Sequence, residues 1–258
     1  MRALLTMLVA LLATEAGAVE VLSLVREVSY LGGLQVPGAI ADSRSSSEFG
    51  AFSEDLSDVL SSPPDVEAAA AASQFSNVST DGSRLAIIVD GDVSARATAL
   101  ADGTIADAMA ESKLVIVFTT TETTQLTVDI VVSSSLGLFF DGTGVGDVAT
   151  SHVASFLLCV VGGGCLADLL VEDISDNLQA VADGLQRSGE LAPGSYVVEL
   201  LAVSQAISQD DGSVLGSAGF SGEITVEPVP ETGAVLSGFV ALFSLAAVGY
   251  RRREVARL

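Results

Sequence analysis

Short runs of β-branched residues separated by turn residues constrain the fold of this chain more than any other feature. The run at 113–121 reads KLVIVFTTT, and the run at 125–133 reads QLTVDIVVS. Val, Ile and Thr favour strands because their branched side chains fit a pleated, half-buried surface. Only residues 122–124 separate the two runs, so the sequence predicts a β-hairpin here.

A second hairpin is predicted at 84–99. Two runs, RLAIIV at 84–89 and VSARATA at 93–99, flank Asp90-Gly91-Asp92. An Asp-Gly pair between such runs is a strong signal for a tight turn. Further strands are predicted at 136–140, 155–161, 166–171, 195–203 and 220–226. Together these runs predict a mainly β fold, an antiparallel, jelly-roll-like β-sandwich, over residues 19–227.

Two segments favour a helix instead. Residues 64–75 (PDVEAAAAASQF) combine an alanine run with Pro and acidic residues at its start. Residues 173–185 (DISDNLQAVADGL) place apolar side chains at 174, 178, 181 and 185, which is the spacing of one helix face. Both segments are ambiguous between helix and strand, and a helix is the interpretation that these features favour.

Residues 1–18 have the features of a secretory signal peptide. Arg2 precedes an apolar run at 3–13, and Ala16 and Ala18 supply the small residues that signal peptidase requires. The run is too short to cross a bilayer, which needs about 20 apolar residues. We expect export with cleavage after Ala18. An N-terminal core helix or a retained anchor is the alternative.

The C-terminal region is apolar and then basic. Residues 233–250 carry no charged side chain, and as a helix they would extend about 27 Å, close to the thickness of a hydrocarbon core. The arginines at 251–253 suit a cytoplasmic flank. The sequence predicts one transmembrane helix at 233–250, anchored by Arg251, Arg252 and Arg253. The alternative, an amphipathic core helix, is disfavoured because the run has no polar face.

A short motif precedes this apolar run. Val229-Pro230-Glu231 followed by an apolar helix and an Arg cluster resembles the PEP-CTERM sorting signal of Gram-negative bacteria, although Thr232 stands where a second Pro is usual. The resemblance assigns residues 228–258 to a sorting signal with its motif at 229–232 and a tail at 251–258. It implies processing by an exosortase-type peptidase. The preceding region also resembles the β-rich part of such proteins in its Ala/Ser/Gln-rich stretch, its FTTTETTQLTV segment and its LAPGSYVVEL segment. This resemblance implies a β-sandwich without a known activity, in which the stretch at 64–75 pairs as a strand.

The same motif allows a second interpretation. Val229 to Gly233 (VPETG) is similar to the LPXTG motif of sortase-anchored wall proteins of Gram-positive bacteria, with Val in place of Leu. Wall-anchored proteins more often carry a long spacer rich in Pro, Thr and Lys, and this chain has a single Lys. The exosortase interpretation is therefore preferred.

The cysteines and the single histidine suggest little chemistry. Export would place Cys159 and Cys165 in an oxidising compartment, so we expect a disulfide, with free buried thiols as the alternative. His152 stands in no hydrolase motif, and a surface or edge-strand position is expected. Acid-glycine segments at 90–92, 141–147 and 210–212 are interpreted as turns, with weak Ca²⁺ sites as the alternative.

The net charge of the chain argues against one class of partner but does not identify the function. With 33 acidic and 11 basic residues the chain has a net charge of −22, which argues against nucleic acid as a partner. We expect an exported, membrane-tethered and then surface-sorted acidic structural or matrix-associated protein without catalytic activity, cofactor or metal. Its expected partners are signal peptidase, the exosortase-type peptidase, the membrane and an extracellular polysaccharide. The alternative is a calcium- or glycan-binding surface module.

Overall fold

The computed structural model describes residues 18–34, 38–62, 66–100, 103–140, 147–173, 180–210 and 212–229. These residues form long strands joined by short connections. The strands are β1 (Val19–Leu34), β2 (Ala39–Ser46), β3 (Gly50–Ser62), β4 (Val66–Thr80), β5 (Leu85–Ala99), β6 (Ile105–Thr120), β7 (Thr124–Phe140), β8 (Asp147–Val160), β9 (Cys165–Asp173), β10 (Val181–Leu191), β11 (Gly194–Gln209) and β12 (Gly212–Pro228).

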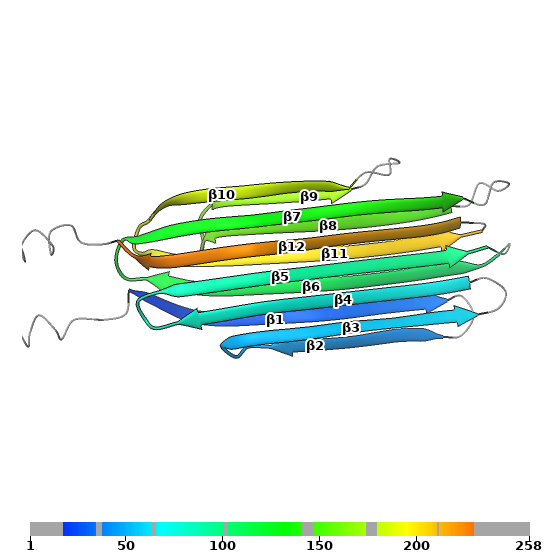
Figure 1. Ribbon diagram of the computed structural model, residues 1–258, viewed down its shortest axis with the longest axis horizontal. Coiled ribbons are helices and arrows are strands. Elements are labelled where there is room, and N and C mark those ends of the chain that lie inside the picture. The colour runs from blue at the N-terminus through cyan, green and yellow to red at the C-terminus, as the bar shows by residue number, and fades with distance from the viewer. Residues whose placement is uncertain are drawn as a thin grey trace, which may run out of the picture. The chain divides into compact units, whose positions relative to one another are not determined.

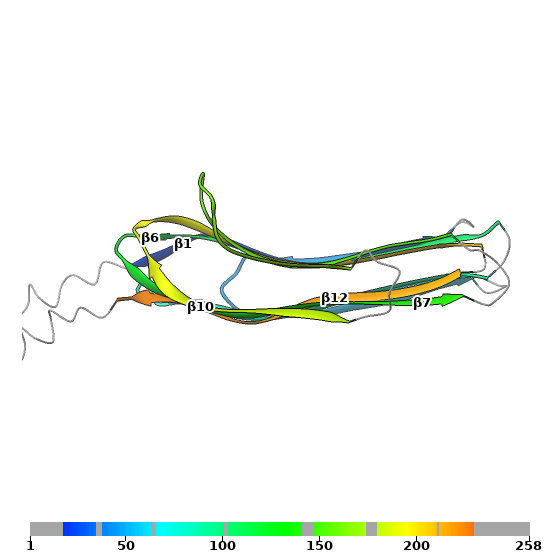
Figure 2. The same cartoon turned by 90° about the horizontal axis from the view of Figure 1, so that it is seen from above.

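The strands form two stacked antiparallel sheets. The first, called sheet A here, has the order β2-β1-β6-β11-β8-β9, and sheet B has the order β10-β7-β12-β5-β4-β3. Figure 1 shows sheet B in front of sheet A, and Figure 2 shows the two sheets edge-on as separate layers. The residues between the layers form one hydrophobic core.

Strands β5 to β12 are nested in pairs. β5 pairs with β12, β6 with β11, β7 with β10, and β8 with β9. The chain therefore resembles one long hairpin wrapped around the sandwich, which is the strand order of a jelly roll. β1 and β2 extend sheet A beside β6, while β4 and β3 extend sheet B beside β5.

The core changes in side-chain size along the strands. Burial alternates residue by residue in β6 and β11, as expected where one strand face lies on a core. One end of the core contains large side chains such as Leu85, Ile116 and Phe118, and the other contains alanines, among them Ala68, Ala70, Ala95, Ala97, Ala106, Ala108 and Ala110.

Both predicted hairpins were wrong, although the residues assigned to their strands do lie in β-strands. β6 lies in sheet A and β7 in sheet B, so residues 121–123 carry the chain between sheets. Asp90-Gly91-Asp92 is not a turn but the middle of β5, which continues unbroken from Leu85 to Ala99. Local sequence indicates extended segments, but it does not indicate which sheet the next segment joins. The runs at 195–203 and 220–226 lie within β11 and β12, which confirms those strands.

Both predicted helices were also wrong where the structure describes them. Residues 66–75 belong to β4, which pairs with β3 and β5 along its length. Residues 181–185 begin β10 and pair with β7, and 174–179 lie outside the described residues. Helix propensity differs among ordinary residues by roughly 0.7 kcal/mol each at most. Pairing with neighbouring strands and burial between sheets outweigh it.

The expected fold class is corrected in one further respect, its transmembrane helix. The part of the chain that the structure describes is all strand and turn, and it contains no helix long and apolar enough to cross a membrane. Residues 233–250, where that helix was expected, lie outside the described residues. The described fold is a β-sandwich, and its apolar side chains pack mainly between two sheets rather than along a helix.

Candidate functional site

A groove of about 470 Å³ crosses the outer face of sheet B, over β3, β4, β5, β12 and β7. Two rows of cross-strand partners line it. One row is Ser53–Phe75–Asp90–Ser221–Val131, and the adjacent row is Asp55–Ser73–Asp92–Gly219–Ser133. Neighbouring strands lie about 4.8 Å apart, so five strands make each row roughly 19 Å long.

The groove is hollow because its second row contains small residues. Ser73, Gly219 and Ser133 project little or nothing from the sheet. A Cβ on Gly219 would lie 3.0 Å from the carbonyl oxygen of Gly91 and 3.1 Å from Oδ1 of Asp92. Even an alanine at this position would therefore crowd the backbone of β5 and the Asp92 carboxylate.

Two apolar side chains stand in the first row, on either side of its polar centre. Phe75 on β4 is 46% exposed and Val131 on β7 is 44% exposed. Asp90 and Ser221 lie between them in the row. The groove thus combines an accessible aromatic ring with hydrogen-bonding groups, as small-molecule sites commonly do.

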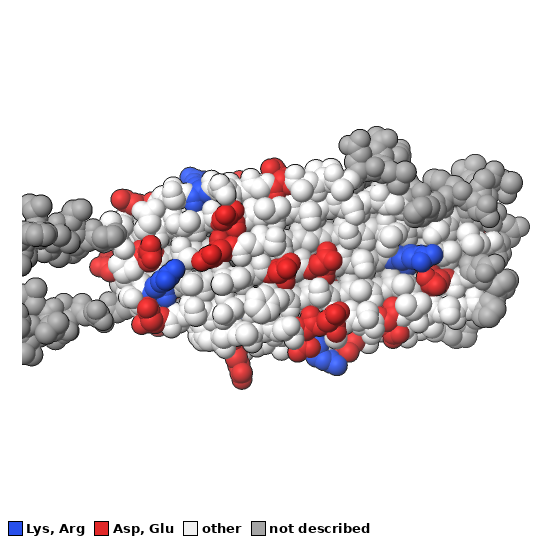
Figure 3. Space-filling view, viewed as in Figure 1, with Lys and Arg blue, Asp and Glu red and all other residues white. Residues whose placement is uncertain are grey.

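The charge of the groove is negative. Asp90 and Asp92 are two residues apart on β5 and face the same side, and Glu54 and Asp55 of β3 contribute two further carboxylates. Within the described residues no basic side chain lines the groove, and none of the four carboxylates forms a salt bridge. Burial, followed by the neighbouring charge of Asp90, raises the pKa of Asp92 above its usual value. Figure 3 shows more acidic than basic side chains on this face.

Gly91 separates the two aspartates because a side chain would not fit there. It faces the core, where an added Cβ would overlap the ring of Phe220 and lie 2.8 Å from Oγ of Ser112. The glycine thus allows Phe220 to pack across β5, while Asp90 and Asp92 face outward. The sequence pattern Asp-Gly-Asp indicated a turn, although its cause is this packing.

The sequence alone did not identify Phe75 and Gly219 as groove residues. Phe75 stood in a segment expected to be helical, and Gly219 lies more than a hundred residues from it in the sequence. Only the register of β4, β5 and β12 places Phe75 opposite Asp90 and Gly219 opposite Asp92. The one available signal was that Asp90 and Asp92 would share a face if their segment were a strand.

The other acid-glycine segments do not form a site in the described residues. Asp210 adopts a positive φ of 49° between β11 and β12. Its carboxylate accepts a hydrogen bond from the Gly103 amide, which ties this turn to the connection before β6. Residues 141–146 and Asp211 lie outside the described residues. Within the described ranges, no group of three or more His, Cys, Asp or Glu side chains could hold a metal ion.

His152 is fully buried, so its expected surface position was wrong. It lies on β8 and points toward β12, where an added Cβ on Gly216 would overlap the imidazole ring. Nδ1 lies 2.9 Å from Oγ of Ser204, and Ser204 donates its hydroxyl proton to the Gly216 carbonyl at 2.9 Å. Nδ1 is therefore the donor to Ser204. The pair links the two sheets, and its burial keeps it away from solvent.

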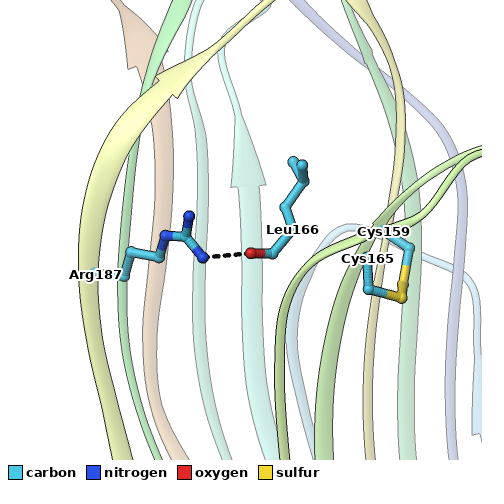
Figure 4. Close-up of a disulfide and its surroundings, with 4 residues drawn as sticks. All are labelled: Cys159, Cys165, Leu166 and Arg187. Carbon is cyan, nitrogen blue, oxygen red and sulfur yellow. Dashed lines mark hydrogen bonds between the residues drawn. A yellow bond between two sulfur atoms is a disulfide. The ribbon is translucent and has the colours of Figure 1, made fainter.

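The disulfide between Cys159 and Cys165 is confirmed. It joins β8 and β9 beside a turn in which the Val160 amide donates to the Gly164 carbonyl at 3.1 Å. Gly162 in this turn has a φ of 75°, which favours glycine. Figure 4 shows the disulfide together with Arg187 of β10, which donates to the Leu166 carbonyl of β9. The turn and the hydrogen bond from Arg187 both fix the position of the edge strand β9.

The expected processing sites lie next to the ends of the sandwich. Ala18 is buried, and its carbonyl accepts a 3.1 Å hydrogen bond from the Thr121 amide. Val229 directly follows β12. Ala16, Pro230, Glu231, Thr232 and the arginines at 251–253 lie outside the described residues.

No family model and no curated protein matches this chain. Solved structures similar to this chain include chains of infectious bursal disease virus. A chain of its Gt strain is 8% identical with a TM-score of 0.17 and covers 92% of this chain and 75% of its own. A chain of the VP2 subviral particle is 9% identical with a TM-score of 0.13, covering 91% and 74%. At these TM-scores the likeness carries no argument about this protein.

Proposed function

We propose that this protein is exported, sorted to the cell surface or extracellular matrix, and acts there as an acidic structural protein without catalytic activity. One observation carries the proposal. β1 begins at Val19, directly after the expected signal-peptidase site, and β12 ends at Pro228, directly before the PEP-CTERM-like motif. Removal of both ends would therefore cost the sandwich no strand, as expected of a domain that is released by processing.

The surface of the sandwich supports a role outside the cell. Acidic side chains predominate on sheet B (Figure 3), and a high net negative charge keeps a released domain soluble. In this proposal the domain associates with a polysaccharide matrix, and an exosortase-type peptidase and signal peptidase are its processing partners. A disulfide at the edge of sheet A fits an oxidising compartment.

Fractionation of the native host, with an intact mass of the recovered protein, tests this function. A surface or secreted form that starts near Val19 and ends between Pro230 and Thr232 is the expected result. Peptidoglycan fragments attached at Thr232 would indicate sortase processing instead. A full-length protein that remains in the cytoplasm would contradict both export and sorting.

A further inference from the structure

We infer that the groove on the outer face of sheet B binds a non-acidic pyranose oligosaccharide. In this arrangement a sugar face packs on the ring of Phe75, and the carboxylates of Asp90 and Asp92 accept hydrogen bonds from its hydroxyl or amino groups. This deepens the proposed matrix association by naming a site and a class of sugar. It rests on that proposal only for the choice of a polysaccharide as ligand.

The shape of the groove suits an extended ligand. Its rows cross five strands, and its volume of about 470 Å³ is within the range of ligand sites. The glycine and serines of the second row leave a channel beside the more prominent Phe75 and Val131. A chain of sugar rings could therefore lie across the strands with one face on the aromatic ring.

The hydrogen-bonding groups of the groove are mainly acceptors. A carboxylate offers two oxygens and about four acceptor positions, and salt bridges occupy none of these on Asp90 or Asp92 within the described part of the chain. Ser221 and Ser133 add hydroxyls that donate or accept. Sugar hydroxyls and protonated amines are donors that match this set.

The charge of the groove selects against acidic sugars. Among the described residues, four carboxylates line it and no Lys or Arg does, so a uronic acid would be repelled whereas a neutral or amino sugar would not. The raised pKa of Asp92 agrees with this selection, because partial burial beside Asp90 already disfavours the charged form of its carboxyl group. A further anion in the groove would disfavour the charged form of Asp92 still more, whereas a hydrogen-bond donor would stabilise it.

Isothermal titration calorimetry on the full chain tests the inference. The probes are tetrasaccharides of β-1,4-linked glucose, of glucosamine and of galacturonic acid, and Ca²⁺ alone. Phe75→Ala and Asp90→Asn are the groove variants. Ile88→Ala on β5 and Glu223→Gln on β12 are the matched controls, because both residues are exposed on the same face outside the groove.

We expect the glucose or glucosamine tetramer to bind and the galacturonate tetramer not to bind. Each groove variant should raise Kd about tenfold or more, since aromatic packing and charge-assisted hydrogen bonds each contribute about 1.4 kcal/mol or more, and the controls should leave Kd unchanged. The inference is overturned if neither sugar binds, if the controls weaken binding as much as the groove variants, or if Ca²⁺ alone binds at Asp90. If the protein binds the sugar but is found in the cytoplasm, the proposed function is contradicted while the inference that the groove binds a sugar still holds.

Discussion

At the scale of single residues, Gly222 lies on β12 directly against the backbone of β7. Its φ is +147°, and an added Cβ would overlap the carbonyl oxygen of Asp129 and lie 2.9 Å from the Cα of Ile130. Such a backbone costs other residues about 1–3 kcal/mol. We expect Gly222→Ala to lower Tm by several degrees, at about 2–4 °C per kcal/mol, in thermal unfolding. Gly189→Ala, where nothing lies within 4 Å, should change little, and equal losses would contradict this explanation.

A second prediction concerns the pH dependence that Asp92 introduces. Because burial beside Asp90 raises its pKa in the folded state, the stability linked to its protonated form is lost as pH rises through that pKa. Asp92→Asn should therefore be more stable than wild type at about pH 7, and the difference should vanish near about pH 3. Solvent exposure keeps the gain below about 1 kcal/mol.

Thermal melts of Asp92→Asn at both pH values measure this effect. Asp168→Asn is the control, because it removes one exposed charge from β9, on the other sheet. A gain that is the same at both pH values, or that the control reproduces, would show that Asp92 is not the cause.

At the scale of elements, Arg26 fixes the connection between β2 and β3. Its side chain is buried on β1, donates to the carbonyls of Gly50 and Glu48, and lies over the ring of Phe52. Arg26→Met would leave these carbonyls without their donor, at a cost of about 2–4 kcal/mol. We expect faster hydrogen exchange confined to residues 39–62. Arg44→Met, at an exposed site, should leave exchange unchanged, and uniform loss of protection would refute a local role.

The disulfide is an element-scale constraint on the β8–β9 hairpin. It closes a loop with a sequence separation of 6, and loop entropy assigns such a closure about 2 kcal/mol. The double variant Cys159→Ser, Cys165→Ser should melt about 4–8 °C below wild type. Calorimetry with and without reductant measures this. Reductant should lower the Tm of wild type alone; an equal response of the variant would mean that another effect dominates.

Strand identity could be predicted from the sequence, whereas strand partners could not. The runs at 113–121 and 125–133 are extended as expected, yet residues 121–123 join two sheets. A turn within one sheet and a turn between two sheets have similar local composition. The alanine run of β4 shows the converse, because pairing with β3 and β5 overrides its helix propensity.

To predict the groove, the register of the strands is required in addition to their partners. Asp90 and Asp92 were visible in the sequence, but their interpretation as a turn concealed that they share a face. Phe75 and Gly219 join them only through the register of three strands. A one-residue slip of β4 would turn Phe75 into the core and remove the groove's aromatic ring.

At the scale of the whole domain, the last strand completes the fold. β12 lies between β7 and β5 and pairs with both along nearly its whole length, so sheet B remains divided until residues 212–228 are in place. The core of this sheet therefore depends on the segment nearest to the expected sorting motif. Long-range pairing of this kind also makes folding slow, because loop closure precedes the contacts that repay it.

Two truncations test this dependence. A chain that ends at Asp211 lacks β12, and we expect it to lose cooperative unfolding and near-UV circular dichroism, since β5 and β7 lose their shared partner. A chain that ends at Val229 keeps every described strand and should melt within about 2 °C of the full chain, a difference below about 1 kcal/mol. If the chain ending at Val229 were also unfolded, residues beyond the sandwich would be needed for stability. Cleavage at 230–232 would then release an unstable domain, and the proposed sorting would fail on physical grounds.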